Sequence, residues 1–174
     1  MFKLLISVVF FLTFSQSTFA HLMVPQNGTL NIKDGFGFLA LSIPVKSLKD
    51  VDDDMNGKLS ITELTKYRPS IVNQIDNEIF LKYNSITLLK EVAYLELNSS
   101  DPAHYLDADQ LLVLIKFTIP GNSEVNSLNL SELNLTINLF GASDAEKNFH
   151  ITVLNSNAQS KINLNQEHPS VNLQ

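Results

Sequence analysis

The sequence contains no cysteine and no tryptophan among its 174 residues. Without cysteine it cannot form disulfides, bind a metal through thiolates or use a cysteine nucleophile. Positive charge is also scarce, because 12 Lys and Arg face 18 Asp and Glu, for a net charge of −6. This balance, with no basic patch, argues against nucleic acid or anionic lipid as a partner. With only 6 Gly and 6 Pro and 44% hydrophobic residues, the chain is neither collagen-like nor disordered.

Long hydrophobic runs are absent beyond the N-terminus. Residues 4–14 are apolar, follow Lys3 and precede Thr18-Phe19-Ala20, which is the pattern of a signal peptide cleaved after Ala20. This run is shorter than the roughly 20 residues that span a bilayer, and no later segment is apolar enough to do so. We predict a signal peptide at residues 1–20, a single domain at 21–174 beginning with His21, and a periplasmic or secreted location.

Most of the remaining sequence alternates between apolar and polar residues, which is the period of a half-buried β-strand. Two such stretches, 29–33 and 36–45, flank Asp34-Gly35, a pair typical of tight hairpin turns. Several short strands separated by Asn, Ser and Gly turns favour an antiparallel β-sandwich. We predict a mainly β fold with inserted helices (α+β), with further strands at 86–97, 111–119, 133–139, 149–153 and 162–164.

One region, residues 48–80, interrupts the strands. Apolar residues recur there at helical spacing, at Ile71, Val72, Ile75 and Ile79. Because proline disrupts a helix interior, Pro69 predicts a short helix followed by a longer one. Both helices would follow the first hairpin.

A metal-binding pattern lies at the start of this interruption. Residues 52–63 read Asp-Asp-Asp-Met-Asn-Gly-Lys-Leu-Ser-Ile-Thr-Glu, which fits the twelve-residue EF-hand calcium loop. That loop offers oxygen ligands at positions 1, 3, 5, 7, 9 and 12, with glycine at the sharp turn of position 6. The predicted ligands, about seven oxygens in all, are the side chains of Asp52, Asp54, Asn56, Ser60 and Glu63 and the backbone carbonyl of Lys58.

The flanks of the loop agree with this register. Leu48 and Val51 occupy apolar positions of an expected incoming helix, and Ser60 with Glu63 forms a capping box for the exiting helix. An alternative interpretation is an acidic turn before a capped helix, without a metal. That interpretation does not explain why every position of the calcium-loop pattern is matched at the correct spacing. Asp53, at position 2, is expected to point to solvent. Since the chain has a single such loop, calcium is predicted to be a structural cofactor.

The order of these features resembles the extracytoplasmic N-terminal part of long members of the HupE/UreJ family of accessory membrane proteins. An Ala-His pair at the export site, a hairpin ending Leu41-Ser42-Ile43-Pro44-Val45, the calcium loop, a helix and several strands carry the resemblance. It implies a Gram-negative exported EF-hand domain without known catalytic activity. The 174 residues contain no membrane domain after the predicted strands, so we do not expect the metal transport of that family here.

Other readings rest on the histidines and on a second acidic stretch. An N-terminal His21 could chelate copper together with His104 or His150, as in copper-dependent oxidative enzymes, while His168 falls in an expected tail. Those enzymes usually carry disulfides and an aromatic residue near the copper. Asp101, Asp107 and Asp109 are expected to form a solvated loop with His104. The main prediction is therefore a non-enzymatic calcium-binding domain, and the alternative is a partner-binding module stiffened by calcium.

Overall fold

The computed structural model describes residues 26–99, 107–120, 129–155 and 158–173. The predicted signal peptide and the residues His21, Asp101 and His104 lie outside these ranges, so the expectations that rest on them stay predictions. Neither the main helix nor any other helix of the described residues combines the length and apolarity needed to cross a membrane.

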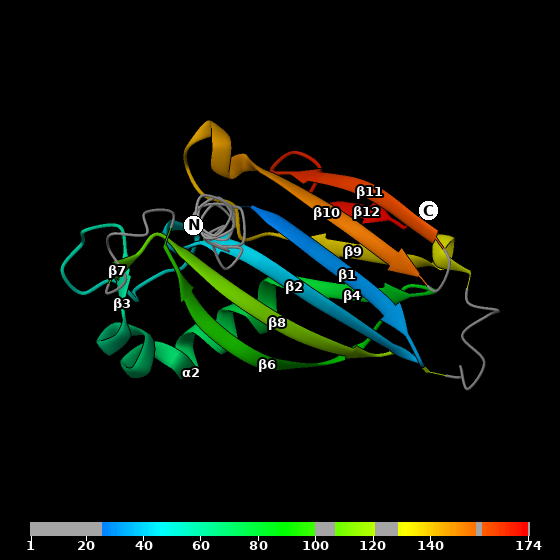
Figure 1. The fold of residues 1–174 in the computed structure, drawn as a ribbon, viewed down its shortest axis with the longest axis horizontal. Coiled ribbons are helices and arrows are strands. Elements are labelled where there is room, and N and C mark those ends of the chain that lie inside the picture. The colour runs from blue at the N-terminus through cyan, green and yellow to red at the C-terminus, as the bar shows by residue number, and fades with distance from the viewer. Residues whose placement is uncertain (1–25, 100–106, 121–128, 156–157, 174) are drawn as a thin grey trace, which may run out of the picture.

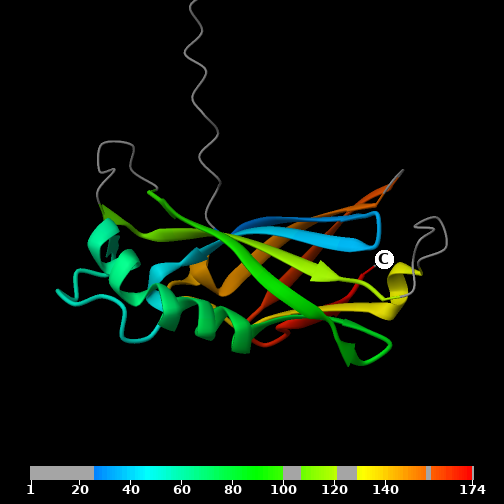
Figure 2. The same cartoon turned by 90° about the horizontal axis from the view of Figure 1, so that it is seen from below.

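The described strands form two larger sheets that pack face to face and one small ribbon (Figures 1 and 2). The six-stranded sheet has the order β11 (Ala158–Asn165), β10 (Asn148–Asn155), β1 (Asn27–Lys33), β2 (Phe36–Pro44), β8 (Gln110–Thr118) and β6 (Leu89–Asn98). The four-stranded sheet has the order β12 (Ser170–Asn172), β9 (Leu133–Ile137), β4 (Ile79–Tyr83) and β5 (Ile86–Thr87). The ribbon pairs β3 (Leu59–Ser60) with β7 (Asp107–Ala108).

These sheets confirm the mainly β fold with its β-sandwich-like body. The hairpin of β1 and β2 turns at Asp34 and Gly35, whose φ angles are 52° and 77°, the left-handed values that a tight primed turn requires. One pairing departs from the antiparallel expectation, because β1 runs parallel to β10. A parallel pair needs a long connection, and residues 34–147 supply it here.

The core lies between the two larger sheets. Alternate residues of β8 point inward and are buried, as period-2 patterning predicts. The largest buried side chains from the six-stranded sheet are Phe117 and Phe149. The four-stranded sheet contributes Leu81, Leu133, Leu135 and Ile137 to the same cluster.

The α-helix of the described residues, α2 (Ile61–Glu78), is continuous, so the predicted break at Pro69 is wrong. An internal proline costs about 3 kcal/mol, since it removes an N–H and crowds the carbonyl four residues earlier. That carbonyl belongs to Thr65, which is exposed like Pro69 and can be hydrated. On the opposite face Ile71 and Ile75 are fully buried, and each contributes about 1.5–3 kcal/mol. Burial of this face therefore outweighs the cost of the proline.

The predicted incoming helix is also wrong. Only a 3₁₀ turn, η1 (Val45–Ser47), precedes the loop. The β2–β8 ladder keeps the backbone extended to this point, since Pro44 pairs with Gln110 and the Val45 N–H donates to the Asp109 carbonyl at 3.0 Å. Asp50 then takes a φ of 57°, which no α-helix accommodates. Too little chain remains for a helix before Asp52.

Lys90 of β6 holds the C-terminal end of α2. Its Nζ donates to the carbonyls of Ile75 at 3.2 Å and Asp76 at 2.6 Å, and also to that of Ile79. The Lys90 side chain is only 10% exposed and lies over the Phe80 ring. Burial lowers the pKa of this ammonium group, although the Asp76 carboxylate opposes the shift. The last carbonyls of a helix need such donors, so Lys90 fixes α2 against the edge of the six-stranded sheet.

Replacing Lys90 with Met should destabilise the fold by about 1–3 kcal/mol, because the helix-end carbonyls lose a charged donor. Urea unfolding followed by circular dichroism measures the change. The matched control is Lys161→Met on β11, an exposed lysine whose loss should matter by less than about 0.5 kcal/mol. Equal unfolding midpoints for the two variants would contradict this role of Lys90.

Candidate metal centre

The loop predicted to bind calcium connects the buried Val51 to the first turn of α2. Its sharp turn lies at Gly57, with a φ of 76°, where the twelve-residue loop requires glycine. A Cβ at this position would also lie 2.7 Å from Cε of Lys46. Leu59, at loop position 8, is fully buried and anchors the end of the loop in the core. The backbone therefore follows the expected path at the positions that shape the loop.

Three carboxylates converge in this loop. One carboxylate oxygen each from Asp52, Asp54 and Glu63 lies within 4.8 Å of the others. Asp54 is exposed, Asp52 is half-buried and Glu63 is 7% exposed. Among the described residues this is the one group of His, Asp or Glu side chains close enough together to hold a metal ion. Loop positions 1, 3 and 12 thus meet in space, although up to ten residues separate them in sequence.

The Glu63 carboxylate is held from both ends of the loop. Its Oε2 accepts hydrogen bonds from the Ser60 N–H at 2.9 Å and the Ser60 hydroxyl at 2.7 Å. Its Oε1 accepts from the Asp53 N–H at 2.8 Å, and the Glu63 N–H donates to Ser60 Oγ in return. The predicted capping box is therefore confirmed. These donors, led by the Ser60 N–H, lower the pKa of Glu63 and favour its charged form.

The side chains of Asp52, Asp54 and Asn56 accept hydrogen bonds from backbone N–H groups of the loop itself. Asp52 accepts from the N–H groups of Gly57 at 2.7 Å and Asn56 at 3.2 Å. Asp54 accepts from the Asn56 N–H at 3.2 Å and from the Asn56 side-chain amide at 3.0 Å. Asn56 Oδ1 in turn accepts from the Lys58 N–H at 2.7 Å. The loop is thereby folded around its own carboxylates.

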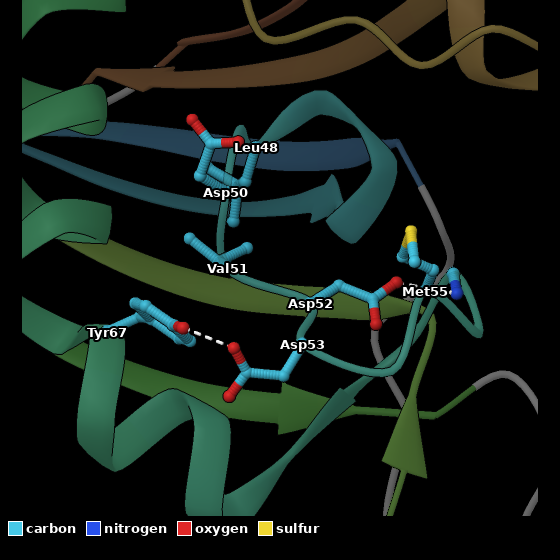
Figure 3. Close-up of a pocket in the computed structure, with 8 residues that line it drawn as sticks. Leu48, Asp50, Val51, Asp52, Asp53, Met55 and Tyr67 are labelled. Carbon is cyan, nitrogen blue, oxygen red and sulfur yellow. Dashed lines mark hydrogen bonds between the residues drawn. The ribbon is translucent and has the colours of Figure 1, made fainter.

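Asp53 does not point freely to solvent, as its loop position had suggested. Its carboxylate forms an ion pair with Lys66 at 2.6 Å and accepts a hydrogen bond from the Tyr67 hydroxyl (Figure 3). The hydrogen bond from Lys66, and then that from Tyr67, lowers the pKa of Asp53. Both partners lie one turn after Glu63 on α2. The EF-hand pattern does not predict this contact, because the contact depends on how the start of the loop lies against α2.

The segment that enters the loop is attached to α2 by side chains. Gln74 accepts from the Lys49 N–H at 2.8 Å and donates to the Lys49 carbonyl at 2.9 Å, as a neighbouring strand would. Leu48 and Val51 are buried in the core, as predicted, but from an irregular segment. With Asp52, Asp53 and Tyr67 they line a pocket of about 540 Å³ beside the loop.

The end of the loop pairs with another part of the same chain. In the ribbon, Leu59 faces Ala108 and Ser60 faces Asp107 in antiparallel register. Leu59 and Ala108 are both buried, so this contact is part of the core. Asp107 therefore belongs to a short strand rather than to the loop that was expected there.

The remaining site candidates lie apart from this centre. His150 is exposed on β10, and its Nδ1 is 2.7 Å from Asn163 Oδ1 across the pairing with β11. His168 donates its backbone N–H to Asn165 Oδ1 at 2.7 Å. Neither belongs to a metal-binding group within the described ranges. The proposed copper partners His21 and His104 lie outside those ranges.

No protein-family model matches this chain, and no curated protein sequence matches it. The resemblance to the HupE/UreJ family therefore stays a prediction.

The lowered pKa of Glu63 predicts how acid affects the metal-free protein. A carboxylate whose folded pKa lies below its unfolded value of about 4.3 contributes stability above that value. The contribution is lost as the pH falls through the lowered folded pKa. Between about pH 5.5 and pH 3, wild-type protein in chelator should lose more stability than the Glu63→Gln variant, as measured by urea unfolding across that range. Parallel pH dependences for the two proteins would contradict the assignment.

Proposed function

We propose that this protein binds one calcium ion in the loop of residues 52–63. The observation that carries the proposal is the convergence of Asp52, Asp54 and Glu63 within 4.8 Å, from the positions where the EF-hand pattern expects ligands. Three carboxylates at this spacing repel one another unless a cation lies among them. The loop concentrates that charge instead of dispersing it.

The donor chemistry fits calcium better than other common metals. Every candidate ligand is an oxygen, whereas zinc and copper favour sites that contain histidine or cysteine. Asn56 and Ser60 already contact Asp54 and Glu63, and each keeps a lone pair for an ion. Lys58 would contribute only its carbonyl. About seven oxygens on a flexible loop suit calcium, while magnesium demands a smaller and more regular octahedron.

The role we propose for the ion is structural, in an exported domain without catalytic activity. A single loop outside the cytoplasm should bind in the weak extracellular range, with a Kd of about 10⁻⁴ to 10⁻³ M. At millimolar external calcium, such binding stabilises the folded state by about 0.4–1.4 kcal/mol. The β-body should therefore stay folded without the ion, while the loop and the first turn of α2 loosen.

Calcium titration by isothermal calorimetry tests this function. Glu63→Gln should weaken binding at least tenfold, since it removes the expected bidentate ligand at position 12. The matched control is Glu146→Gln, because Glu146 caps η4 (Asp144–Lys147) through an equivalent box with Ser143 far from the loop in sequence. That variant should bind calcium like wild type. Absence of calcium binding by wild-type protein at millimolar concentrations would refute the proposal.

A further inference from the structure

The start of the loop lacks the element that normally positions it. In a helix–loop–helix unit, an incoming helix fixes the first ligand. Here the chain is irregular from Leu48 to Asp54. Some other contact must therefore set where Asp52 and Asp54 lie relative to Glu63.

Asp53 makes that contact. It lies between the two aspartate ligands and contacts two successive turns of α2. Its N–H donates to Glu63 Oε1 at 2.8 Å, and its carboxylate binds Lys66 and Tyr67 in the next turn of the helix. The side chain of Tyr67 projects from α2 directly toward Asp53 (Figure 3). Tyr67 is half-buried and packs against the core, so it is a firm attachment point.

We propose that Asp53, Lys66 and Tyr67 form a latch that positions the loop for calcium, in place of an incoming helix. The three are positioning residues, since none occupies a ligand position. This inference rests on the proposed calcium site and adds residues to it outside the EF-hand pattern. The latch brings Asp52 and Asp54 to Glu63 before the ion arrives, so its loss should weaken binding through the cost of ordering the loop.

Two substitutions distinguish the latch from a direct electrostatic effect of Lys66 on calcium. Lys66 is a cation near a predicted cation site, so removing it would by charge alone tighten calcium binding. If the latch positions the loop, the same substitution weakens binding. Tyr67→Phe changes no charge, so electrostatics alone predicts no effect, whereas loss of the latch again predicts weaker binding. The two explanations therefore predict opposite changes in the calcium Kd for Lys66→Gln. For Tyr67→Phe, only the latch predicts a change in the Kd.

The experiment is calcium titration by calorimetry of wild type, Lys66→Gln, Tyr67→Phe and Lys66→Arg, well below their melting temperatures. We expect Lys66→Gln and Tyr67→Phe each to raise the Kd about three- to tenfold, the modest effect of losing one exposed hydrogen bond or ion pair. Lys66→Arg keeps a cation and donors and should stay within about twofold of wild type. The matched control is Lys46→Gln, because Lys46 is an exposed lysine whose side chain lies beside Gly57 of the loop but is neither a predicted ligand nor part of the latch. It should leave the Kd unchanged or lower it.

Two outcomes would overturn the proposal in distinguishable ways. If wild type binds calcium and Lys66→Gln binds as tightly as Lys46→Gln or more tightly, with Tyr67→Phe unchanged, the latch is refuted and the calcium site stands. If wild type does not bind calcium, the proposed function fails, and the latch has no ion to serve. A thermal melt in chelator accompanies each titration, because a purely structural role would lower the melting temperature without changing the Kd.

Discussion

Like-charge repulsion among Asp52, Asp54 and Glu63 is the constraint around which this part of the molecule is organised. Two carboxylates at such a spacing repel by about 1 kcal/mol in a water-like medium, and by more where water is excluded. Glu63 is buried, so its charge is the most costly of the three. Nearby hydrogen-bond donors partly offset this cost, since the N–H groups of Ser60, Asp53 and Gly57 all donate to these carboxylates. A cation would complete the compensation that these donors begin.

The scaffold places this charged loop at one end of a β-sandwich through α2. Ser60, the residue before Ile61, caps the N-terminus of α2, while Lys90 of β6 holds the C-terminal end of the helix. Between them, buried Ile71 and Ile75 fix the helix to the core strongly enough to tolerate Pro69. Gln74 and the latch then attach the incoming segment to the helix surface. The helix is thus the common support of both ends of the loop.

Much of the fold and of the loop could be predicted from local sequence, because their signals are local. Apolar patterning predicted β1, β2, β6, β8, β9, β10 and β11, Asp34-Gly35 predicted the hairpin, and the spacing from Asp52 to Glu63 predicted residues that do meet in space. The patterning did not predict β12 or β4, whose first residue, Ile79, had been assigned to helical spacing. The capping box was also visible in the sequence, because its partners are three residues apart. In each case the decisive interactions join residues that are near neighbours in the chain or that share one repeat.

The misses concern contacts set by tertiary packing. Pro69 was expected to end a helix, but propensity was outweighed by two isoleucines whose burial the sequence could not quantify. The predicted incoming helix does not form because the β2–β8 ladder, which joins residues far apart in sequence, keeps the chain extended up to Pro44 and then binds the Val45 N–H. Asp53 was assigned to solvent because loop position describes ligands and says nothing of which helix residues lie opposite. The pairing of the loop with β7 was likewise invisible until the fold brought residue 108 to residue 59.

The most direct measurement is a crystal structure of the protein grown with calcium, with anomalous scattering used to locate the ion. One calcium ion should lie about 2.3–2.6 Å from carboxylate oxygens of Asp52, Asp54 and Glu63, the usual range for calcium–oxygen bonds. The side chains of Asn56 and Ser60 and the carbonyl of Lys58 should complete the coordination. A loop without an ion at millimolar calcium, or an ion bound by other residues, would contradict the central claim.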